Sequence, residues 1–327
     1  MKELIEAFPQ NIVDALKIAE ASSFQQPKNE IHNVLICGLG GSGIGAKLVA
    51  NWIQDEIKVP VAISNEYTLP AFVNKNTLVI GSSYSGNTEE TIMSIQEAHG
   101  RGCHILGVCS GGQFEAFCKE NGYDCVIVPG GNPPRSALAF SLVQLLNMFS
   151  RLGLISDQSL KEIEASVALI EGDKEHIHQE AKDLADFLFG KVGILYAETK
   201  YEGVIVRARQ QFNENSKYLA WHHTIPEMNH NELVGWGGGD ERFAPVFFYT
   251  GDLNPRNQKR MDITLEAVQK KCGKVFRVEP KGNNFIERSI YTINIVDWAS
   301  YYLCNLNGAD IIDIAIIDYL KGEMAKF

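Results

Sequence analysis

The sequence predicts an α/β protein of two domains, each built on a doubly wound parallel sheet. Short apolar runs alternate with helical patterns along most of the chain, and this alternation is typical of βαβ units. The apolar runs are continuous, which indicates strands buried on both faces, as in a parallel sheet. The length of 327 residues favours two domains, because domains commonly hold about 100–200 residues.

The first domain is expected at residues 1–153. It begins with apolar positions at helical spacing from Leu4 to Ala19. Strands are expected at Val34–Cys37, Val59–Ile63, Thr77–Ile80, His104–Val108 and Cys125–Val128. Helical patterns follow near Ile44–Trp52, Glu89–Ala98, Glu115–Asn121 and Ser136–Leu152. This half of the chain therefore predicts one doubly wound sheet.

Strand patterns disappear between Ser156 and Asp186, where acidic residues and lysines accumulate, so residues 154–189 are predicted as a helical connector. The α/β rhythm returns in a second domain, residues 190–308. Its strands are expected at Lys191–Tyr196, Ala244–Tyr249 and Lys274–Val278, and its helices at Val204–Leu219, Gln258–Lys271 and Ile286–Asn305. The stretch between the first of these helices and the second strand is expected to be loop-rich. Residues 309–327 are expected to form a C-terminal helix.

The chain is acidic, with 30 Lys and Arg against 40 Asp and Glu and a formal net charge of −10. This excess argues against binding to nucleic acid or to an anionic membrane surface. A small anionic substrate is compatible with it, because a ligand interacts with the few groups of its pocket. No apolar run approaches the roughly 18–20 residues of a membrane span, and the N-terminal segment lacks the apolar core of a signal peptide, so a cytoplasmic protein is expected.

Seven cysteines, an odd number without a CxxC pair, predict reduced, buried and unreactive thiols. Their spacing fits no structural zinc pattern, and the eight histidines form no HxH or HExxH arrangement. No metal site is therefore expected.

The first strand runs into a glycine-rich turn, Gly38–Gly45, that opens a helix. Its glycines satisfy G-x-G-x-x-G, the pattern of dinucleotide-binding turns, and Glu66 stands beyond the second strand, where that fingerprint has an acid. A nicotinamide-dependent dehydrogenase is therefore one hypothesis, and a tight turn without a ligand is another. Ser42 instead favours a phosphate monoester, because a hydroxyl inside the turn adds a hydrogen-bond donor.

A second turn, Gly81–Thr91, follows the third strand and places several hydroxyl groups at a helix N-terminus. Ser83, Ser85 and Thr88 can each donate to an oxygen, and the first-turn N–H groups and the helix dipole add positive potential. The turn therefore predicts a phosphate-binding cup. An ordinary N-cap at Thr88 or Asn87 would explain one of these residues but not the whole cluster.

The sequence G-G-S-G and, further along, S-Y-S-G-N-T resembles the SIS (sugar isomerase) domain. Almost the whole chain resembles the bifunctional phosphoglucose/phosphomannose isomerases, which carry two such flavodoxin-like domains. The resemblance implies that no nicotinamide or other cofactor is used. It also implies that the phosphate of the substrate is held by Gly41, Ser42, Ser83, Ser85 and Thr88.

The same resemblance assigns the reacting groups. A P-R motif implies that Arg135 lies near the reacting carbons, where a positive charge can stabilise an enediolate; without the motif it would be read as a surface ion-pair partner. An N-E-N-x-K motif implies that Glu214 is the base, whereas composition alone leaves Glu214, Glu227 and Glu232 equivalent. A P-E-x-x-H-N motif implies that His230 opens the sugar ring and reaches the site from the partner subunit of a homodimer.

An L-K motif in the last helix implies that Lys321 reaches the sugar ring oxygen, although by itself it would be a solvated charge at a helix end. Which of His230 and Lys321 opens the ring is left open. One or two turns earlier, family members often have a small hydroxyl residue associated with room for the mannose epimer. This chain has isoleucines there: Ile311, Ile312, Ile314 and Ile316. The departure leaves the acceptance of mannose 6-phosphate open.

The resemblance therefore implies a metal-independent aldose–ketose isomerase that interconverts glucose 6-phosphate with fructose 6-phosphate through a cis-enediol, and we expect mannose 6-phosphate as a further substrate. One alternative is a non-catalytic regulator that binds a phosphosugar, although no helix-turn-helix or basic extension is evident. Another is an isomerase of a different sugar phosphate, such as arabinose 5-phosphate or an amino sugar. The dehydrogenase hypothesis rests only on the glycines and Glu66.

Overall fold

The computed structural model describes residues 1–324 and 326, and the chain divides into two compact units. We call them the N-terminal unit, Glu6–Gly172 with Gly282–Ile290, and the C-terminal unit, Met1–Ile5 with Asp173–Lys281 and Tyr291–Phe327. Among the described residues, no helix combines the length and the apolar composition needed to cross a membrane.

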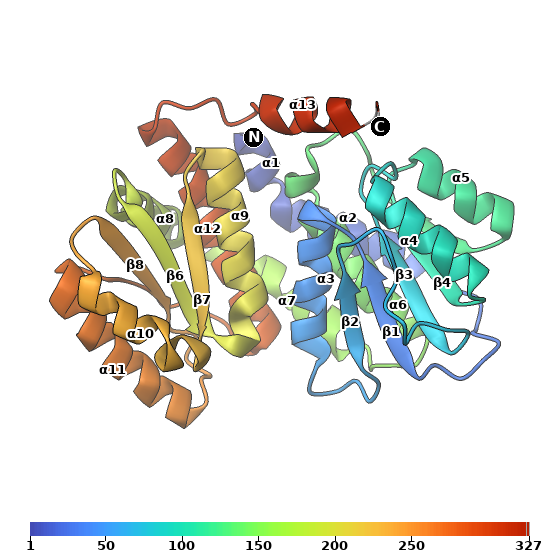
Figure 1. The fold of residues 1–327 in the computed structure, drawn as a ribbon, viewed down its shortest axis with the longest axis horizontal. Coiled ribbons are helices and arrows are strands. Elements are labelled where there is room, and N and C mark those ends of the chain that lie inside the picture. The colour runs from blue at the N-terminus through green and yellow to red at the C-terminus, as the bar shows by residue number, and fades with distance from the viewer. Residues whose placement is uncertain (325, 327) are drawn as a thin grey trace. The chain divides into compact units, whose positions relative to one another are not determined.

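The N-terminal unit is built on a parallel sheet of five strands in the order β2-β1-β3-β4-β5 (Figure 1). The strands are β1 (Asn33–Cys37), β2 (Val61–Ser64), β3 (Thr77–Ser82), β4 (His104–Cys109) and β5 (Asp124–Ile127). All of β3 is buried, as its continuous apolar run predicts. The strand order reverses between β1 and β3, and in doubly wound sheets ligands bind at the carboxyl edge beside such a point.

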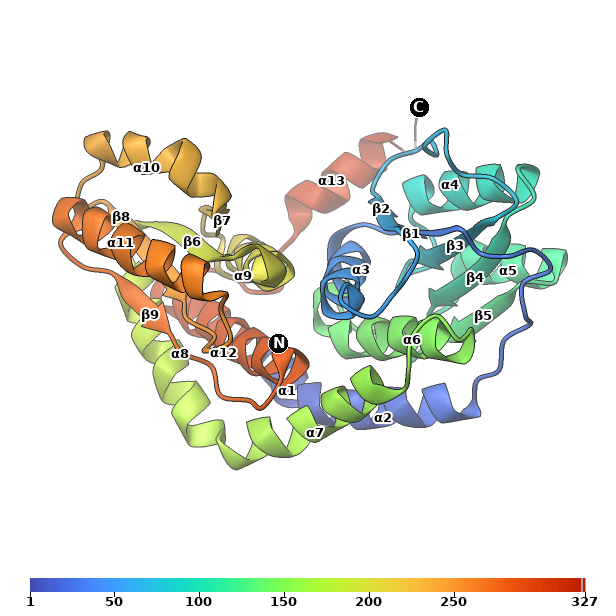
Figure 2. The same ribbon diagram turned by 90° about the horizontal axis from the view of Figure 1, so that it is seen from below.

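Helices cover both faces of this sheet (Figure 2). They are α2 (Phe8–Ala21), α3 (Gly40–Ile53), α4 (Glu89–Gly100), α5 (Gly112–Asn121), α6 (Leu138–Arg151) and α7 (Gln158–Gly172). On one face, Ile95 of α4 and Phe114 of α5 pack into a core with Val79 of β3. On the other face lie α3 and α6, and α2 packs against α6, where the buried side chain of Gln144 donates to the Ala15 carbonyl at 2.7 Å.

The C-terminal unit has a parallel sheet of four strands in the order β7-β6-β8-β9. Its strands are β6 (Val192–Glu198), β7 (Ala220–Ile225), β8 (Phe243–Phe248) and β9 (Phe276–Val278). This order repeats that of the first four strands of the N-terminal sheet. The predicted fold class, α/β with two doubly wound parallel sheets and a C-terminal helix, is confirmed.

The prediction of a loop-rich stretch after the first helix of this half is wrong at residues 220–225, which form β7. This strand lies at the edge of the sheet, beside β6. Its Trp221 side chain is 53% exposed, and His222 and His223 are partly exposed. An edge strand that is open to solvent lacks the continuous apolar run by which the other strands were predicted.

The remaining helices are α1 (Lys2–Glu6), α8 (Lys174–Leu188), α9 (Glu202–Ser216), α10 (Glu232–Gly235), α11 (Pro255–Cys272), α12 (Phe285–Leu306) and α13 (Ala315–Met324). On one face of the C-terminal sheet, Met261 and Val268 of α11 pack against Phe247 of β8. Two helices, α9 and α12, run side by side in this unit and are joined by buried polar contacts (Figure 1).

Glu180 on α8 makes the stability of the fold pH-dependent. Its side chain is 13% exposed, and burial, together with the nearby charges of Glu279 and Asp183, raises the pKa of its carboxyl to about 7. The folded protein therefore holds this proton more tightly than the unfolded chain does. The contribution to stability is full below the ordinary pKa of 4.5 and is lost as the pH rises through about 7.

We expect Glu180→Gln to raise the free energy of unfolding by roughly 1–3 kcal/mol at pH 8 and to change it little at pH 4.5. Urea unfolding at the two pH values measures the difference. Glu175→Gln, an exposed carboxylate on the same helix, is the control and should give no such pH-dependent gain. An equal effect of Glu180→Gln at both pH values would contradict the assignment.

Candidate active site

The carboxyl ends of β1 and β3 carry the two turns predicted to bind phosphate, and the structure joins them directly. The Ser42 hydroxyl, 7% exposed in the first turn of α3, accepts a hydrogen bond from the Tyr84 backbone N–H at 3.0 Å. A Cβ on Gly41 would lie 2.8 Å from the Pro134 carbonyl oxygen. Glycine is therefore needed at this position for the first turn to fit against the segment that carries Arg135.

Two hydroxyl groups of the second turn, those of Ser83 and Thr88, are linked to each other and do not serve as an N-cap. Ser83 Oγ donates to Thr88 Oγ1 at 3.0 Å, and Thr88, the N-cap residue of α4, makes no side-chain capping bond. The Asn87 side chain instead accepts from the Gln113 N–H at 3.1 Å, while Ser85 is exposed on the same turn. The capping explanation for these residues is therefore not realised. The structure gathers all five residues predicted to hold phosphate where the strand order reverses.

Tyr84 organises these loops, and the sequence did not single it out. Its hydroxyl donates to the Pro129 carbonyl at 2.9 Å, and its own carbonyl accepts from the N–H and the hydroxyl of Ser110 at 2.8 and 2.7 Å. Gly86 has a φ of +66°, and a Cβ there would lie 1.7 Å from the Gly111 carbonyl oxygen. Ser110 and Gly111 belong to a third loop, which follows β4. The S-G-G sequence directly after β4 could have identified this loop.

Arg135 lies on η1, a short 3₁₀ turn over Pro134–Ser136, and is 4% exposed. The turn is closed by hydrogen bonds from the Ser136 and Ala137 N–H groups to the carbonyls of Pro133 and Pro134, at 2.9 and 3.1 Å. A surface ion-pair role, which the residues alone favoured, does not fit this burial. The structure therefore buries Arg135 next to the turn of Gly41.

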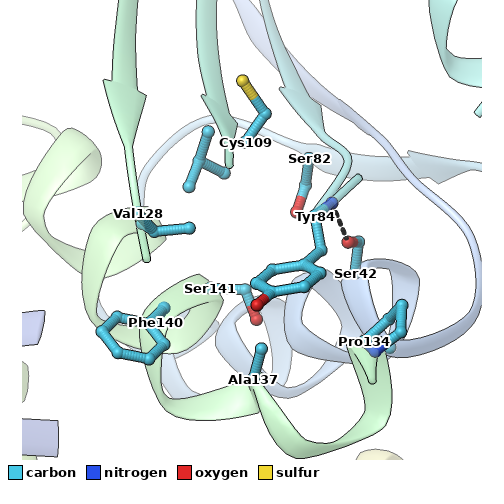
Figure 3. A pocket seen from close by; sticks show the side chains of 11 residues that line it. Ser42, Ser82, Tyr84, Cys109, Val128, Pro134, Ala137, Phe140 and Ser141 are labelled. Atoms are coloured by element: carbon cyan, nitrogen blue, oxygen red, sulfur yellow. Dashed lines mark hydrogen bonds between the residues drawn. The ribbon is translucent and has the colours of Figure 1, made fainter. Parts of the chain in front are cut away.

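A small cavity of about 10 Å³ lies among these loops (Figure 3). Ser42, Ser82 and Tyr84 line it, and the Ser82 hydroxyl is buried with no hydrogen-bond partner among the residues described. This volume holds about one water molecule, so a hexose phosphate does not fit. A sugar phosphate would have to contact the exposed side of the turns, where Ser85 lies.

The glycines of the first turn have a packing role that requires no dinucleotide. A Cβ on Gly43 would lie 2.6 Å from the Gly38 carbonyl oxygen, and one on Gly38 would lie 2.6 Å from the Ser82 carbonyl oxygen. These glycines therefore let the turn close tightly against β3. The G-x-G-x-x-G pattern is explained by this contact.

In the C-terminal unit, Glu214 lies in the last turn of α9 and is partly exposed. This turn lies at the start of β7, because the Asn213 side chain accepts from the Ala220 N–H at 3.3 Å. Lys217 ends the helix in the left-handed region with a φ of 51°, and its ammonium group donates to the Glu214 carbonyl at 2.9 Å. The position of Glu214 is thus fixed relative to the beginning of the strand.

His230 lies beyond the other end of the same strand, on η3, a 3₁₀ turn over Glu227–His230. The strand has six residues, which span roughly 16 Å at about 3.3 Å per residue. A general acid or base must come within about 3 Å of the proton it transfers. The segments that carry Glu214 and His230 in one chain therefore lie at opposite ends of β7, well beyond this distance from each other.

A second polar cluster near His230 was not predicted. His223 Nδ1 lies 2.6 Å from a carboxylate oxygen of Glu232, the other oxygen accepts from the Tyr196 hydroxyl, and Trp236 Nε1 donates to that hydroxyl at 2.9 Å. The cluster joins α10 to β6 and β7. Glu232 therefore has a structural role, which separates it from Glu214, whereas Glu227 is exposed and accepts from Asn231 at 3.0 Å.

The carboxyl edge of the C-terminal sheet is occupied by carboxylates. The buried Glu198 side chain accepts from the Asn254 N–H and the Asn257 amide at 3.2 and 2.6 Å. Burial acts to raise the pKa of Asp252, but hydrogen bonds from Lys200, Thr250 and Tyr201 outweigh it and hold that pKa below its ordinary value. A phosphate would meet two carboxylates here, and their negative charges would repel it.

Lys321 lies on α13 and is exposed, as are most of the isoleucines before it, including Ile312 and Ile316. Within residues 1–324 and 326, no group of three or more His, Cys, Asp or Glu side chains is placed to hold a metal ion. The predicted site residues therefore lie on different parts of the chain. The predicted phosphate-binding residues and Arg135 lie on the turns and η1 of the N-terminal unit. Glu214 lies at the end of α9, His230 on η3 and Lys321 on α13.

The two doubly wound parallel sheets place this chain in the class of SIS-domain proteins. Residues 29–120 match the SIS domain family, and residues 177–324 match the family described as the bacterial phospho-glucose isomerase C-terminal SIS domain. The C-terminal domain of glucosamine-fructose-6-phosphate aminotransferase from Francisella tularensis has the same fold, with a TM-score of 0.78 and 16% identity over 95% of this chain and 97% of that one.

The chain is 35% identical to the bifunctional phosphoglucose/phosphomannose isomerase of Caldicellulosiruptor bescii, over 100% of its own length and 99% of that protein. It is 33% identical to the protein of the same name from Aquifex aeolicus, over 90% of each. The chain therefore belongs to the family of bifunctional phosphoglucose/phosphomannose isomerases, and it is a sugar-phosphate isomerase.

Proposed function

We propose that this isomerase interconverts glucose 6-phosphate with fructose 6-phosphate, and mannose 6-phosphate with the same ketose, without a metal. The observation that carries the proposal is the pairing of the Ser83 and Thr88 hydroxyls in a turn whose Tyr84 N–H donates to the Ser42 hydroxyl, where the strand order of the N-terminal sheet reverses. Together with helix N-termini, such a cluster offers the donors that a phosphate monoester requires. The names of the relatives in Caldicellulosiruptor bescii and Aquifex aeolicus support the choice of hexose.

In the proposed reaction, His230 of the partner subunit or Lys321 moves a proton between the ring oxygen and the anomeric hydroxyl, and the sugar opens. Glu214 then removes the proton from carbon 2 of the aldose and leaves a cis-enediolate. The Arg135 guanidinium stabilises the negative charge on the enediolate oxygens. Return of the proton from Glu214 to carbon 1, with transfer of the hydroxyl proton from oxygen 2 to oxygen 1, gives the ketose.

The geometry of the structure supports these roles in addition to the motifs. Arg135 is buried beside the turn of Gly41, where a fixed charge costs no reorganisation during the reaction. Glu214 is partly exposed at the end of α9, so its carboxylate can meet a substrate. The distance between Glu214 and His230 along β7 favours a homodimer in which each histidine serves the partner's site.

The test is a coupled assay with glucose 6-phosphate and mannose 6-phosphate as separate substrates, with and without EDTA. We expect fructose 6-phosphate from both, at rates that EDTA does not change, and no turnover of unphosphorylated glucose or mannose. Loss of activity in EDTA would reject the metal-free mechanism. Tight binding of both hexose phosphates without turnover would instead favour a sensor, and turnover of glucose 6-phosphate alone would reject the mannose activity.

A further inference from the structure

We propose that Ser300 is a positioning residue for the base, and that it acts through Asn215 and Ser216 to hold the last turn of α9 in the orientation that Glu214 needs. This inference rests on the proposed role of Glu214. It assigns a function in catalysis to a serine on α12 that lies outside every motif of the chain.

Ser300 is completely buried where α12 passes α9. Its hydroxyl accepts from the Asn215 side-chain amide at 3.0 Å and donates to the Asp297 carbonyl at 2.7 Å. Its carbonyl accepts from the Ser216 hydroxyl at 2.7 Å. One residue of α12 therefore binds the two residues that directly follow Glu214.

Two further contacts, one from α12 and one from the residue directly after it, bracket this point on α9. Near the middle of α9, the Arg207 guanidinium and the Asp297 carboxylate form a buried ion pair at 2.9 Å. At its end, the Asn307 side-chain amide donates to the Ser216 carbonyl at 2.9 Å. An α-helix leaves its last carbonyls without partners inside the helix, so this bond also caps α9.

These contacts fix the rotation of α9 about its own axis. Arg207 and Asn215 are eight residues apart, which places them about 80° apart around the helix axis, and both are bonded to residues of α12. Glu214 precedes Asn215 by one residue and therefore projects about 100° away. With Asn215 held in a buried site, the last turn of α9 is kept from rotating, and this fixes the direction of the partly exposed Glu214 side chain.

The residue that ends the last turn of α9 has a backbone conformation that costs free energy. Lys217, directly after Ser216, has a φ of 51°, a conformation that is costly for a residue with a side chain. The buried bonds to Ser300 and the bond from Asn307 oppose relaxation of this turn. An acid–base group displaced by about 1 Å can lose on the order of 10²-fold in rate, so a loosened turn would slow proton transfer.

The test compares Ser300→Ala with Ser289→Ala, a matched control on the same helix. Ser289 is also completely buried, but among the residues described its hydroxyl bonds only to the Phe285 carbonyl of its own helix, at 2.8 Å. We expect Ser300→Ala to lower kcat for both glucose 6-phosphate and fructose 6-phosphate about tenfold or more, with KM within about twofold. Ser289→Ala should keep kcat within about twofold of the wild type, although both variants lose one buried hydroxyl.

Asn307→Ala provides a second variant at an exposed position, where the protein is expected to fold normally. Its matched control is Asn305→Ala, exposed on the last turn of α12. We expect Asn307→Ala to lower kcat severalfold and Asn305→Ala to leave it unchanged. Should Ser300→Ala fail to fold, the Asn307→Ala pair decides the question alone.

A purely structural role would lower the urea midpoint of Ser300→Ala without lowering kcat, and that result would overturn the proposal. Equal losses of kcat in Ser300→Ala and Ser289→Ala, or a change confined to KM, would overturn it too. The proposed base is tested separately by Glu214→Gln. If that variant stayed active, the role of Glu214 would fail whatever the serine variants did, and the two failures are therefore distinguishable.

Discussion

We expect Glu214→Gln to lower kcat for glucose 6-phosphate by at least about 10³-fold and to change KM by less than about threefold. Glutamine has nearly the shape of glutamate, so the last turn of α9 and its contacts with Ser300 should persist. The amide cannot accept a proton from carbon 2. The loss therefore appears in the proton-transfer step and leaves the binding of the phosphate unchanged.

Solvent exchange gives the direct measurement. In D₂O the wild type should introduce deuterium at carbon 2 of glucose 6-phosphate as the enediolate takes up a solvent-derived proton, and Glu214→Gln should not. Glu227→Gln is the matched control, because Glu227 is an exposed glutamate in the neighbouring motif and composition alone did not separate it from Glu214. Undiminished exchange in Glu214→Gln, or equal losses in both variants, would reject Glu214 as the base.

The phosphate cup could be predicted from the sequence because its residues directly follow buried strands. The family resemblance implied that Ser42 and the hydroxyls from Ser83 to Thr88 hold one phosphate, and they lie at one edge of the sheet because the carboxyl ends of parallel strands meet there. Tyr84 belongs to the same motif, but its role in joining the loops could not be predicted, because its contacts are with the loops after β4 and β5. No local pattern in a sequence reports which loop a tyrosine will join.

The C-terminal unit was harder to predict for a related reason. Its edge strand β7 reads A-W-H-H-T-I, which mixes exposed and buried side chains and resembles a polar loop. Without that strand, Glu214 and His230 would belong to one hydrophilic stretch, whereas the strand places them at opposite ends. The contact of Ser300 with Asn215 joins residues 85 positions apart, so it too becomes visible only in the folded chain.

The separation of Glu214 from His230 predicts that two inactive variants restore each other. In a dimer of one Glu214→Gln chain and one His230→Ala chain, one site receives both substitutions and the other receives an intact Glu214 and an intact His230. After subunit exchange at equal amounts, about half of the dimers are mixed and each has one working site, so activity should return to about a quarter of the wild-type value. Each variant measured alone should stay at or below roughly 1%.

The matched control places both substitutions in one chain and mixes it with the wild type. If sites are shared, a mixed dimer has no complete site, because one lacks Glu214 and the other lacks His230. Exchange should then lower the activity of an equal mixture from about half to about a quarter of the wild-type value. If each site lay within one chain, the single variants would not restore each other and the control mixture would stay at about half. For shared sites, exchange therefore raises the activity of the first mixture and lowers that of the second, whereas for unshared sites it changes neither. Mass measurement of differently labelled chains shows that exchange has occurred.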